Sequence, residues 1–292
     1  MRTPDFWSRK PGILAHSLRP LGAIYGAATA KRIANVAGYK ASAPVICIGN
    51  INAGGTGKTP TTVALAERIA ERGKAPIILS RGYGGSANGP LLVNPKSDSA
   101  DRVGDEPLLM SGFAKTIVAK DRIAGAKLAE CEGADVILMD DGFQSPALHK
   151  DVSIVVVDAL RGFGNGFCIP AGPLRESLAA GLKRADLLLS IGGENAQNAF
   201  AQRHSFNVPH LTGALMPLPT GMRWNGLAAY AFAGIGHPEK FFQSLRLAGV
   251  DLRGTQSLAD HEPISRPMLE RLRREAISAN AHSYAPRCAS WL

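Results

Sequence analysis

A glycine-rich segment directly after a short apolar run constrains this chain more than any other feature of its sequence. Residues 44–49 read Pro-Val-Ile-Cys-Ile-Gly, and residues 52–59 read Asn-Ala-Gly-Gly-Thr-Gly-Lys-Thr. The apolar, β-branched run predicts a buried parallel strand, and the apolar spacing over residues 61–72 predicts a helix. A strand, a loop of small residues and a helix in this order predict a phosphate-binding loop, because main-chain N–H groups at a helix start can approach phosphate oxygens.

This loop predicts a nucleotide site that uses ATP and Mg²⁺. Lys58 is expected to reach the β- and γ-phosphates, and the Thr59 hydroxyl to bind the metal. The strict pattern has glycine where Asn52 stands, so the loop is a variant, and an ordinary glycine-rich turn is the alternative. The residues predicted to bind the nucleotide are Ala53, Gly54, Gly55, Thr56, Gly57, Lys58, Thr59 and Pro60.

A second apolar run ends in two acids. Val-Ile-Leu-Met over residues 136–139 is followed by Asp140 and Asp141. An acid at the end of a strand beside a phosphate loop typically positions Mg²⁺ and its water, although it can also simply begin a turn. The co-occurrence with Lys58 favours the metal role.

The remaining pattern predicts an α/β fold with a parallel sheet of the P-loop NTPase type, because short apolar runs alternate with helical spacing. We expect an N-terminal arm over residues 1–40, a P-loop domain over 41–165 and a smaller α/β domain over 166–292. The predicted strands cover residues 44–49, 75–79, 116–119, 134–139, 152–157, 187–191 and 228–233, and the predicted helices 61–72, 121–132, 238–248 and 266–279.

Charge is concentrated at the two ends of the chain. The formal net charge is +9, of which residues 1–40 carry +6 and residues 266–292 carry +3, so the body is neutral. A nucleic-acid groove usually makes the body basic, so no nucleic-acid partner is expected. A basic arm instead suggests an anionic surface such as a membrane.

The arm has the spacing of an amphipathic helix. Leu14, Leu18, Leu21 and Tyr25 recur at helical offsets, and Pro20 is expected to kink the helix. An interfacial helix with basic flanks is one interpretation, and a helix packed on its own domain is the other. No apolar run approaches the ~20 residues that span a bilayer.

Taken together, the motifs resemble the tetraacyldisaccharide 4′-kinase family of lipid A biosynthesis. The resemblance runs from about residue 4 to 265 and includes the Phe-Trp pair of the arm. Its blocks, in order, are Gly49-Asn50, residues 53–60, Ser-Arg-Gly-Tyr-Gly-Gly at 80–85, Val-Gly-Asp-Glu-Pro at 103–107, Asp-Asp-Gly-Phe-Gln at 140–144 and Pro-Ala-Gly-Pro-Leu-Arg-Glu at 170–176.

The resemblance implies ATP-dependent phosphorylation of the 4′-hydroxyl of a tetraacyl glucosamine disaccharide 1-phosphate, which gives lipid IV-A. It also implies peripheral attachment to the cytoplasmic face of a Gram-negative inner membrane and an anionic glycolipid substrate. No protein partner is inferred. The alternatives are another P-loop ATPase, of the ligase or partitioning type, and a catalytically silent membrane-bound nucleotide-binding protein.

The same resemblance assigns catalytic roles. Asp105 matches the family's base, which accepts the proton of the sugar hydroxyl, and Glu106 is a weaker candidate near the metal. His261 matches the histidine that pairs with this base, and Lys58 completes the catalytic set. Without the family, Asp105 would be interpreted as a helix cap and His261 as a surface histidine.

Four further residues are expected to contact the substrate. Arg81 and Tyr83 follow the second predicted strand, and Arg175 and Glu176 follow the proposed domain boundary. The Arg175 guanidinium suits a phosphate. Turn formation for the first pair and a solvated surface for Arg175 are the alternatives.

The C-terminal segment departs from the family. Residues 280–292 lack the β-run and the Thr-Thr-Glu-Lys-Asp sequence that family members carry. We expect no strand there, and a frameshift or a premature natural end near residue 280 is one hypothesis. Asp-His-Glu at residues 260–262 also replaces the usual Asp-His-His.

Overall fold

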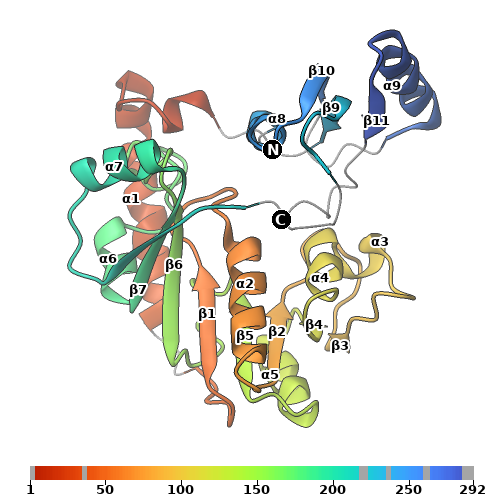
Figure 1. Ribbon diagram of the computed structural model, residues 1–292. Helices are drawn as coiled ribbons and strands as arrows, with labels where there is room; N and C mark the ends of the chain where they lie inside the picture. The colour runs from red at the N-terminus through yellow and green to blue at the C-terminus, as the bar shows by residue number, and fades with distance from the viewer. Residues whose placement is uncertain (1–3, 35–37, 217–222, 235–237, 259–263, 285–292) are drawn as a thin grey trace. The chain divides into compact units, whose positions relative to one another are not determined.

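The chain forms two compact units, each built around its own sheet. The computed structural model describes residues 4–34, 38–216, 223–234, 238–258 and 264–284. Within these residues the first unit extends to Leu215, and the second begins at Met216. Figure 1 shows the elements of both units in chain order.

An eight-stranded sheet organises the first unit. Its strands are β1 Val45–Gly49, β2 Pro76–Ser80, β3 Leu91–Leu92, β4 Thr116–Val118, β5 Val136–Asp140, β6 Val152–Asp158, β7 Leu187–Ile191 and β8 His210–Gly213. The order across the sheet is β3-β4-β2-β5-β1-β6-β7-β8. Every neighbouring pair is parallel except β3 and β4, so the carboxyl ends of the seven parallel strands meet at one edge.

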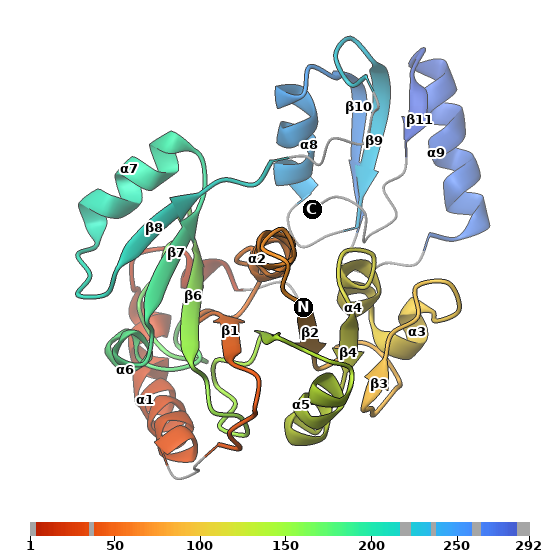
Figure 2. The same cartoon turned by 60° about the horizontal axis from the view of Figure 1, so that its bottom comes forward.

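Helices bury both faces of this sheet, which is why its strands are continuous apolar runs. The helices of the unit are the 3-10 helix η1 Asp5–Trp7 and the α-helices α1 Ile13–Ala34, α2 Lys58–Ala70, α3 Ala100–Val103, α4 Asp105–Met110, α5 Arg122–Cys131, α6 Leu178–Lys183 and α7 Glu194–Arg203. One hydrophobic cluster joins α2 and α4 to one face, and another joins α5, α6 and α7 to the opposite face. Figure 2 shows α2 and α4 lying across the sheet from α5 and α6.

The boundary between the units differs from the expected one at residue 165. Strands β7 and β8 continue the large sheet, because β6 pairs with β7 and β7 with β8. The division therefore falls between Leu215 and Met216. The loop at residues 162–173 suggested a domain boundary in the sequence, but it only connects two neighbouring strands of one sheet.

Helix α1 packs through small residues rather than through its leucines. Gly22 and Gly26 are buried, and a Cβ at Gly22 would lie 2.6 Å from the main-chain oxygen of Cys168. The helix continues through Pro20. Of the four residues that the spacing placed on one face, Leu14, Leu21 and Tyr25 are exposed and Leu18 is half-buried, so most of this face does not pack on the unit itself.

The second unit is a small doubly wound sheet. It contains β9 Ala228–Ala233, α8 Pro238–Leu247, β10 Asp251–Ser257, α9 Arg266–Ser278 and β11 His282–Tyr284. The central β9 pairs in parallel with β10 and β11. Residues Ala229, Ala231 and Ala233 pack with α8, while Phe232 between them packs with Leu272 of α9, as expected for alternating sides of a strand.

The expectation that residues 280–292 contain no strand is wrong for their first part. His282–Tyr284 pairs with β9, with His282 opposite Ala229. Main-chain hydrogen bonds form this ladder, so an apolar β-run is not needed to extend it. The predicted α/β class with a mostly parallel sheet is confirmed.

Candidate functional site

The glycine-rich segment forms a loop between β1 and α2, where the sequence predicts a phosphate-binding loop. Gly54 has φ +117° and Gly57, the N-cap of α2, has φ +93°. Residues other than glycine rarely adopt these φ angles. The turn at Gly57 lets α2 begin at Lys58, three residues before the predicted helix start, so the first N–H groups of α2 face the loop.

Two asparagines fix this loop from behind. The Nδ2 of the buried Asn50 donates to Gly54 O at 3.1 Å and to Thr56 Oγ1 at 3.2 Å. The Nδ2 of Asn52 donates to Gly162 O at 2.9 Å. The latter contact explains the asparagine at a position where the strict motif has glycine: its side chain ties the loop to the segment after β6.

The acid pair lies directly beside the loop because β5 is the parallel neighbour of β1, with Ile48 opposite Asp140. Lys58 Nζ lies 3.8 Å from Asp141 Oδ1. The hydroxyl of Thr62, one turn into α2, donates to Asp140 Oδ1 at 3.3 Å. The structure thus brings together Lys58, Asp140 and Asp141.

The two acids have opposite electrostatic environments. Burial, and after it the nearby Glu106 carboxylate, raises the pKa of Asp140, which is 3% exposed, to about 7. Burial also acts to raise the pKa of Asp141, but Lys58 and Arg175 outweigh it and hold that pKa below its usual range. Asp141 is therefore a stable anion, whereas Asp140 is a buried carboxyl that needs a cation to ionise readily.

This donor set fits Mg²⁺. A hard cation takes carboxylate and hydroxyl oxygens, and Asp140 ends β5 beside the first turn of α2, where the buried Thr59 hydroxyl lies. Among the described residues no group of three or more acidic, histidine or cysteine side chains is arranged as a metal cluster. Mg²⁺ is usually held by one or two carboxylates together with substrate phosphates, so this arrangement agrees with a metal that arrives with the nucleotide.

Close glycine contacts bring the turn after β2 against the start of α4. A Cβ at Gly104 would lie 2.6 Å from Tyr83 O, and a Cβ at Gly85 would lie 2.7 Å from Arg102 O. Asp105, the first residue of α4, is half-buried, and the Tyr83 side chain is 88% exposed. The predicted base and the predicted substrate residues Arg81 and Tyr83 therefore belong to adjacent backbone segments.

The other two expected substrate residues have different surroundings. The Arg175 guanidinium donates to Asp141 Oδ1 at 2.9 Å and to Gln144 Oε1 at 3.3 Å. Glu176 is only 1% exposed, and its carboxylate is bound by Arg184 and Gln144. Arg175 thus faces the acid pair, whereas Glu176 lies behind it and offers nothing to a ligand.

Arg122 is a residue of the site that the sequence did not reveal. It is buried, and its guanidinium donates to Leu79 O at 2.9 Å and to Asp140 O at 3.0 Å. It therefore joins the ends of β2 and β5 beneath the acids. No motif marks it, because an arginine in the first turn of a helix normally faces solvent. His261, the predicted partner of the base, lies outside the described residues.

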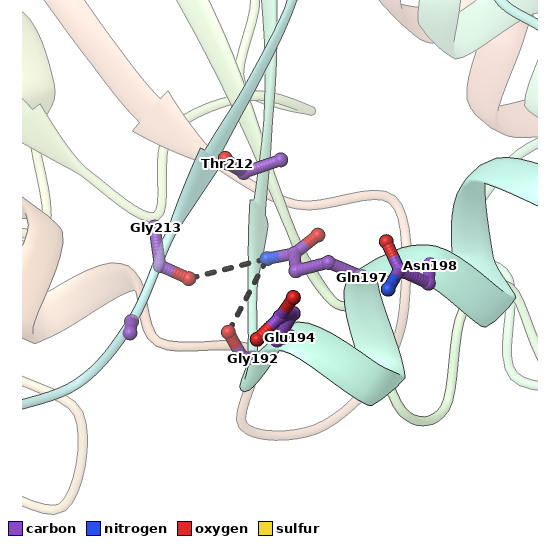
Figure 3. A pocket seen from close by; sticks show the side chains of 7 residues that line it. Gly192, Glu194, Gln197, Asn198, Thr212 and Gly213 are labelled. Carbon is purple, nitrogen blue, oxygen red and sulfur yellow. Dashed lines mark hydrogen bonds between the residues drawn. The ribbon is translucent and has the colours of Figure 1, made fainter.

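A cavity of about 460 Å³ opens at the same edge of the sheet, beyond β7 and β8. Figure 3 shows the Gln197 amide reaching the carbonyls of Gly192 and Gly213, at 3.5 and 3.2 Å. These contacts join the ends of the two strands to α7. The cavity is lined by Gly192, Glu194, Gln197, Asn198, Thr212, Gly213 and Ala214.

Comparison with known proteins identifies the family to which this site belongs. A family model described as tetraacyldisaccharide-1-P 4′-kinase matches residues 14–283. A tetraacyldisaccharide 4′-kinase of Jannaschia sp. is 56% identical over 96% of this chain and 86% of its own length, and that of Dinoroseobacter shibae is 55% identical over 96% and 85%. The chain belongs to this kinase family.

A solved member of the kinase family has the same architecture. The structure of LpxK from Aquifex aeolicus, described as an "apo" form in complex with ATP, superposes with a TM-score of 0.70. It is 28% identical and covers 87% of this chain and 84% of its own. The family predicted from the motifs is confirmed, and membership in it decides against the ligase and partitioning ATPase alternatives.

Proposed function

We propose that this protein transfers the γ-phosphoryl group of ATP to the 4′-hydroxyl of a tetraacyl glucosamine disaccharide 1-phosphate. One observation carries this assignment. Lys58, Asp140 and Asp141 converge on a phosphate loop in a chain that shares 56% identity with a tetraacyldisaccharide 4′-kinase.

Each group has a defined task in this reaction. The loop N–H groups and Lys58 hold the β- and γ-phosphates. Asp105 accepts the hydroxyl proton while the sugar oxygen bonds to the γ-phosphorus and the bond to the β,γ-bridging oxygen breaks, giving a phosphate monoester and ADP. Asp140 and Thr59 would hold Mg²⁺, with Asp141 beside them, and the bound metal would neutralise charge on the phosphates.

The assay that tests this function uses the full chain, ATP with a radiolabelled γ-phosphate, Mg²⁺ and the disaccharide 1-phosphate lipid. We expect label to enter the lipid, and only when ATP, Mg²⁺ and the lipid are all present. Labelled inorganic phosphate in place of labelled lipid would indicate an ATPase. No transfer at all, with ADP still bound, would identify a catalytically silent nucleotide-binding protein.

The cavity beyond β7 and β8 suits the nucleoside end of ATP. Ile191 at the end of β7 packs against Gly57, since a Cβ at Gly57 would lie 3.4 Å from Ile191 Cγ1. The cavity begins at the next residue, Gly192, and its volume lies in the range of small-molecule sites. Thr212 and Asn198 offer side-chain donors and acceptors to a base.

We expect Thr212→Trp, which fills this cavity, to weaken ADP binding about 10-fold. Tripolyphosphate, which needs only the phosphate loop, should bind as it does to the parent chain. Calorimetric titration of both ligands measures the difference. Leu211→Trp is the matched control, because Leu211 precedes Thr212 on β8, is exposed and does not line the cavity. Equal loss for both ligands would contradict a nucleoside site here.

The exposed apolar residues of α1 suit a lipid surface. Ile13 is 91% exposed and Ile24 67%, and the last turn of the helix carries Lys31 and Arg32. Apolar side chains flanked by cations are the signature of a helix that lies in the interface plane. None of the described helices is both long and apolar enough to span a bilayer. We infer that α1 docks the protein on an anionic membrane, the cytoplasmic face of the inner membrane.

We expect the double variant Ile13→Ser/Ile24→Ser to bind anionic vesicles about 10-fold more weakly than the parent chain. The reason is the lost transfer of two large apolar side chains from water: full burial of each stabilises by roughly 1.5–3 kcal/mol, and 10-fold corresponds to burying both of them only in part. Co-sedimentation with vesicles of anionic phospholipid measures the effect. Leu247→Ser, which removes an equally exposed side chain from α8, should bind normally. Equal sedimentation of the double variant and the parent chain would refute docking by α1.

A further inference from the structure

A buried polar chain lies behind the acid pair and is not accounted for by substrate or nucleotide contacts. The Glu176 carboxylate accepts a hydrogen bond from Gln144 Nε2 at 2.9 Å through Oε1 and an ion pair from Arg184 through Oε2. A buried carboxylate is costly unless it is paired and hydrogen-bonded. Both carboxylate oxygens of Glu176 are bound by side chains of the protein, so the carboxylate is held in one orientation inside the fold.

Arg184 also contacts Phe143, which precedes Gln144 in the turn after β5. It donates to Phe143 O at 3.2 Å, and its guanidinium carbon lies 4.4 Å from the centroid of the Phe143 ring. The arginine therefore contacts the residue before Gln144 through both its main chain and its ring. A planar guanidinium can stack and donate at once, which a lysine ammonium cannot.

The turn that these residues hold begins with a strained acid. Asp141 has φ +47°, a value that costs free energy in any residue with a side chain. The next residue is glycine, and a Cβ at Gly142 would require the buried side chain of Met139 to move. Such a backbone persists only when its surroundings fix it, and the contacts of Phe143 and Gln144 do so on the C-terminal side of Asp141.

Gln144 connects this support to the site itself. Its Nε2 donates to Asn50 O, at 2.8 Å, as well as to Glu176, and its Oε1 accepts from Arg175. Arg175 in turn donates to Asp141 Oδ1. The orientation of the Gln144 amide is fixed by these contacts, because only its nitrogen can donate to both the Glu176 carboxylate and the Asn50 carbonyl.

We propose that Glu176 and Arg184 are positioning residues that hold Asp141 in the orientation needed for Mg²⁺-nucleotide, acting through Gln144 and the Phe143 carbonyl. Neither residue contacts the lipid. This inference rests on the proposed function to the extent that Asp141 lies beside the Mg²⁺ of the bound nucleotide.

The test compares ADP binding with Mg²⁺ and with EDTA in the full chain carrying Glu176→Gln. The new amide must direct its NH₂ group at Gln144 Nε2 or at Arg184, which breaks one of the two contacts. We expect binding in Mg²⁺ to weaken about 10-fold and binding in EDTA to stay within about twofold of the parent chain. The KM for the lipid should not change. Glu71→Gln, an exposed acid of a surface ion pair, is the matched control and should behave as the parent.

Substitutions at Gln144 and Arg184 test whether Glu176 acts on Asp141 through these two residues. Gln144→Leu should cause the same loss of Mg²⁺-dependent binding, and its combination with Glu176→Gln should lose no more than either alone, because both act on one arrangement. Arg184→Lys should retain more Mg²⁺-dependent binding than Arg184→Met, since it keeps the charge opposite Glu176.

Three outcomes would overturn the inference. A raised lipid KM with normal Mg²⁺-dependent ADP binding would make Glu176 a substrate contact. An equal loss of binding in Mg²⁺ and in EDTA, with a lower unfolding midpoint, would make it a structural ion pair only. If the parent chain binds ADP equally well in Mg²⁺ and in EDTA, Asp141 does not have the metal-linked role that the inference assumes. ADP binding is measured without catalysis. The experiment therefore tests this inference even if the chain does not phosphorylate the lipid.

Discussion

Asp105→Asn is expected to lower kcat about 10³-fold while ADP binding stays unchanged. A positioned general base contributes roughly 10²–10⁴ to a rate, and an asparagine of the same shape cannot accept the proton of the sugar hydroxyl. Asp105 begins α4, beside the backbone turn that carries Arg81 and Tyr83, and lies outside the phosphate loop. Nucleotide affinity should therefore report an intact site, and lipid phosphorylation the missing base.

The alternative role for Asp105, a helix cap, predicts the opposite pattern. Losing a cap costs about 1 kcal/mol of stability and leaves the chemistry intact, so the unfolding midpoint would fall and kcat would not. Asp101→Asn is the matched control, because Asp101 occupies the first turn of the neighbouring α3 and is exposed. A variant at Asp105 that keeps more than a tenth of the parent kcat would exclude the base.

The parts of the site that could be predicted are those encoded by consecutive residues. β1, the glycine-rich loop and α2 follow one another without interruption, and the acids directly end β5. Parallel pairing of β1 with β5 then brings the two segments together with no further information. Apolar runs that form strands and glycine-rich loops are encoded by consecutive residues, so they can be predicted without knowledge of the tertiary contacts.

The parts that could not be predicted depend on contacts between distant segments. Glu176 looks like a substrate residue beside Arg175, and only its pairing with Arg184 and Gln144 reveals that it is buried. Arg122 is buried through two main-chain oxygens that belong to different strands. In both cases the sequence shows a charged residue in a loop or at a helix start, where exposure is normal.

The strand β10 and the buried face of α1 consist largely of polar or small residues, and apolar spacing predicted neither of them. β10 reads Asp-Leu-Arg-Gly-Thr-Gln-Ser and forms one edge of its sheet, so it carries little apolar signal. The face that α1 buries consists of residues such as Ala15, Gly22 and Gly26, whereas hydrophobic spacing pointed to its leucines. Close backbone packing needs small side chains, and apolar periodicity does not detect it.

Asp140→Asn should have two effects of opposite sign: lipid phosphorylation falls at least about 10²-fold, and the metal-free chain becomes more stable. Asparagine retains an oxygen for the Thr62 hydroxyl but carries no charge toward Mg²⁺. It also removes a carboxyl whose pKa burial and Glu106 raise to about 7. In EDTA at pH 8 we expect a gain of about 1–2 kcal/mol in the free energy of unfolding, measured by urea denaturation.

The pH dependence of this gain follows from the direction of the shift. Between the ordinary aspartate pKa and about 7 the unfolded chain has lost this proton while the folded chain still holds it, so the protein loses stability progressively over this range and carries the full cost above about 7. The difference between Asp140→Asn and the parent chain should accordingly shrink toward pH 5. Mg²⁺ with ADP should reverse the order at pH 8, because the parent chain gains more from a ligand that it binds more tightly.

Asp151→Asn provides the control of opposite sign. Burial acts to raise the pKa of Asp151, but hydrogen bonds from Lys40 and from the Val45 N–H hold it below its usual value. Removing that charge should lower stability by up to about 1 kcal/mol. If both aspartate variants are equally less stable than the parent chain in EDTA, the loss of a hydrogen-bonded side chain explains the result. That outcome would contradict the idea that the buried Asp140 carboxylate destabilises the metal-free protein and that Mg²⁺ offsets this cost.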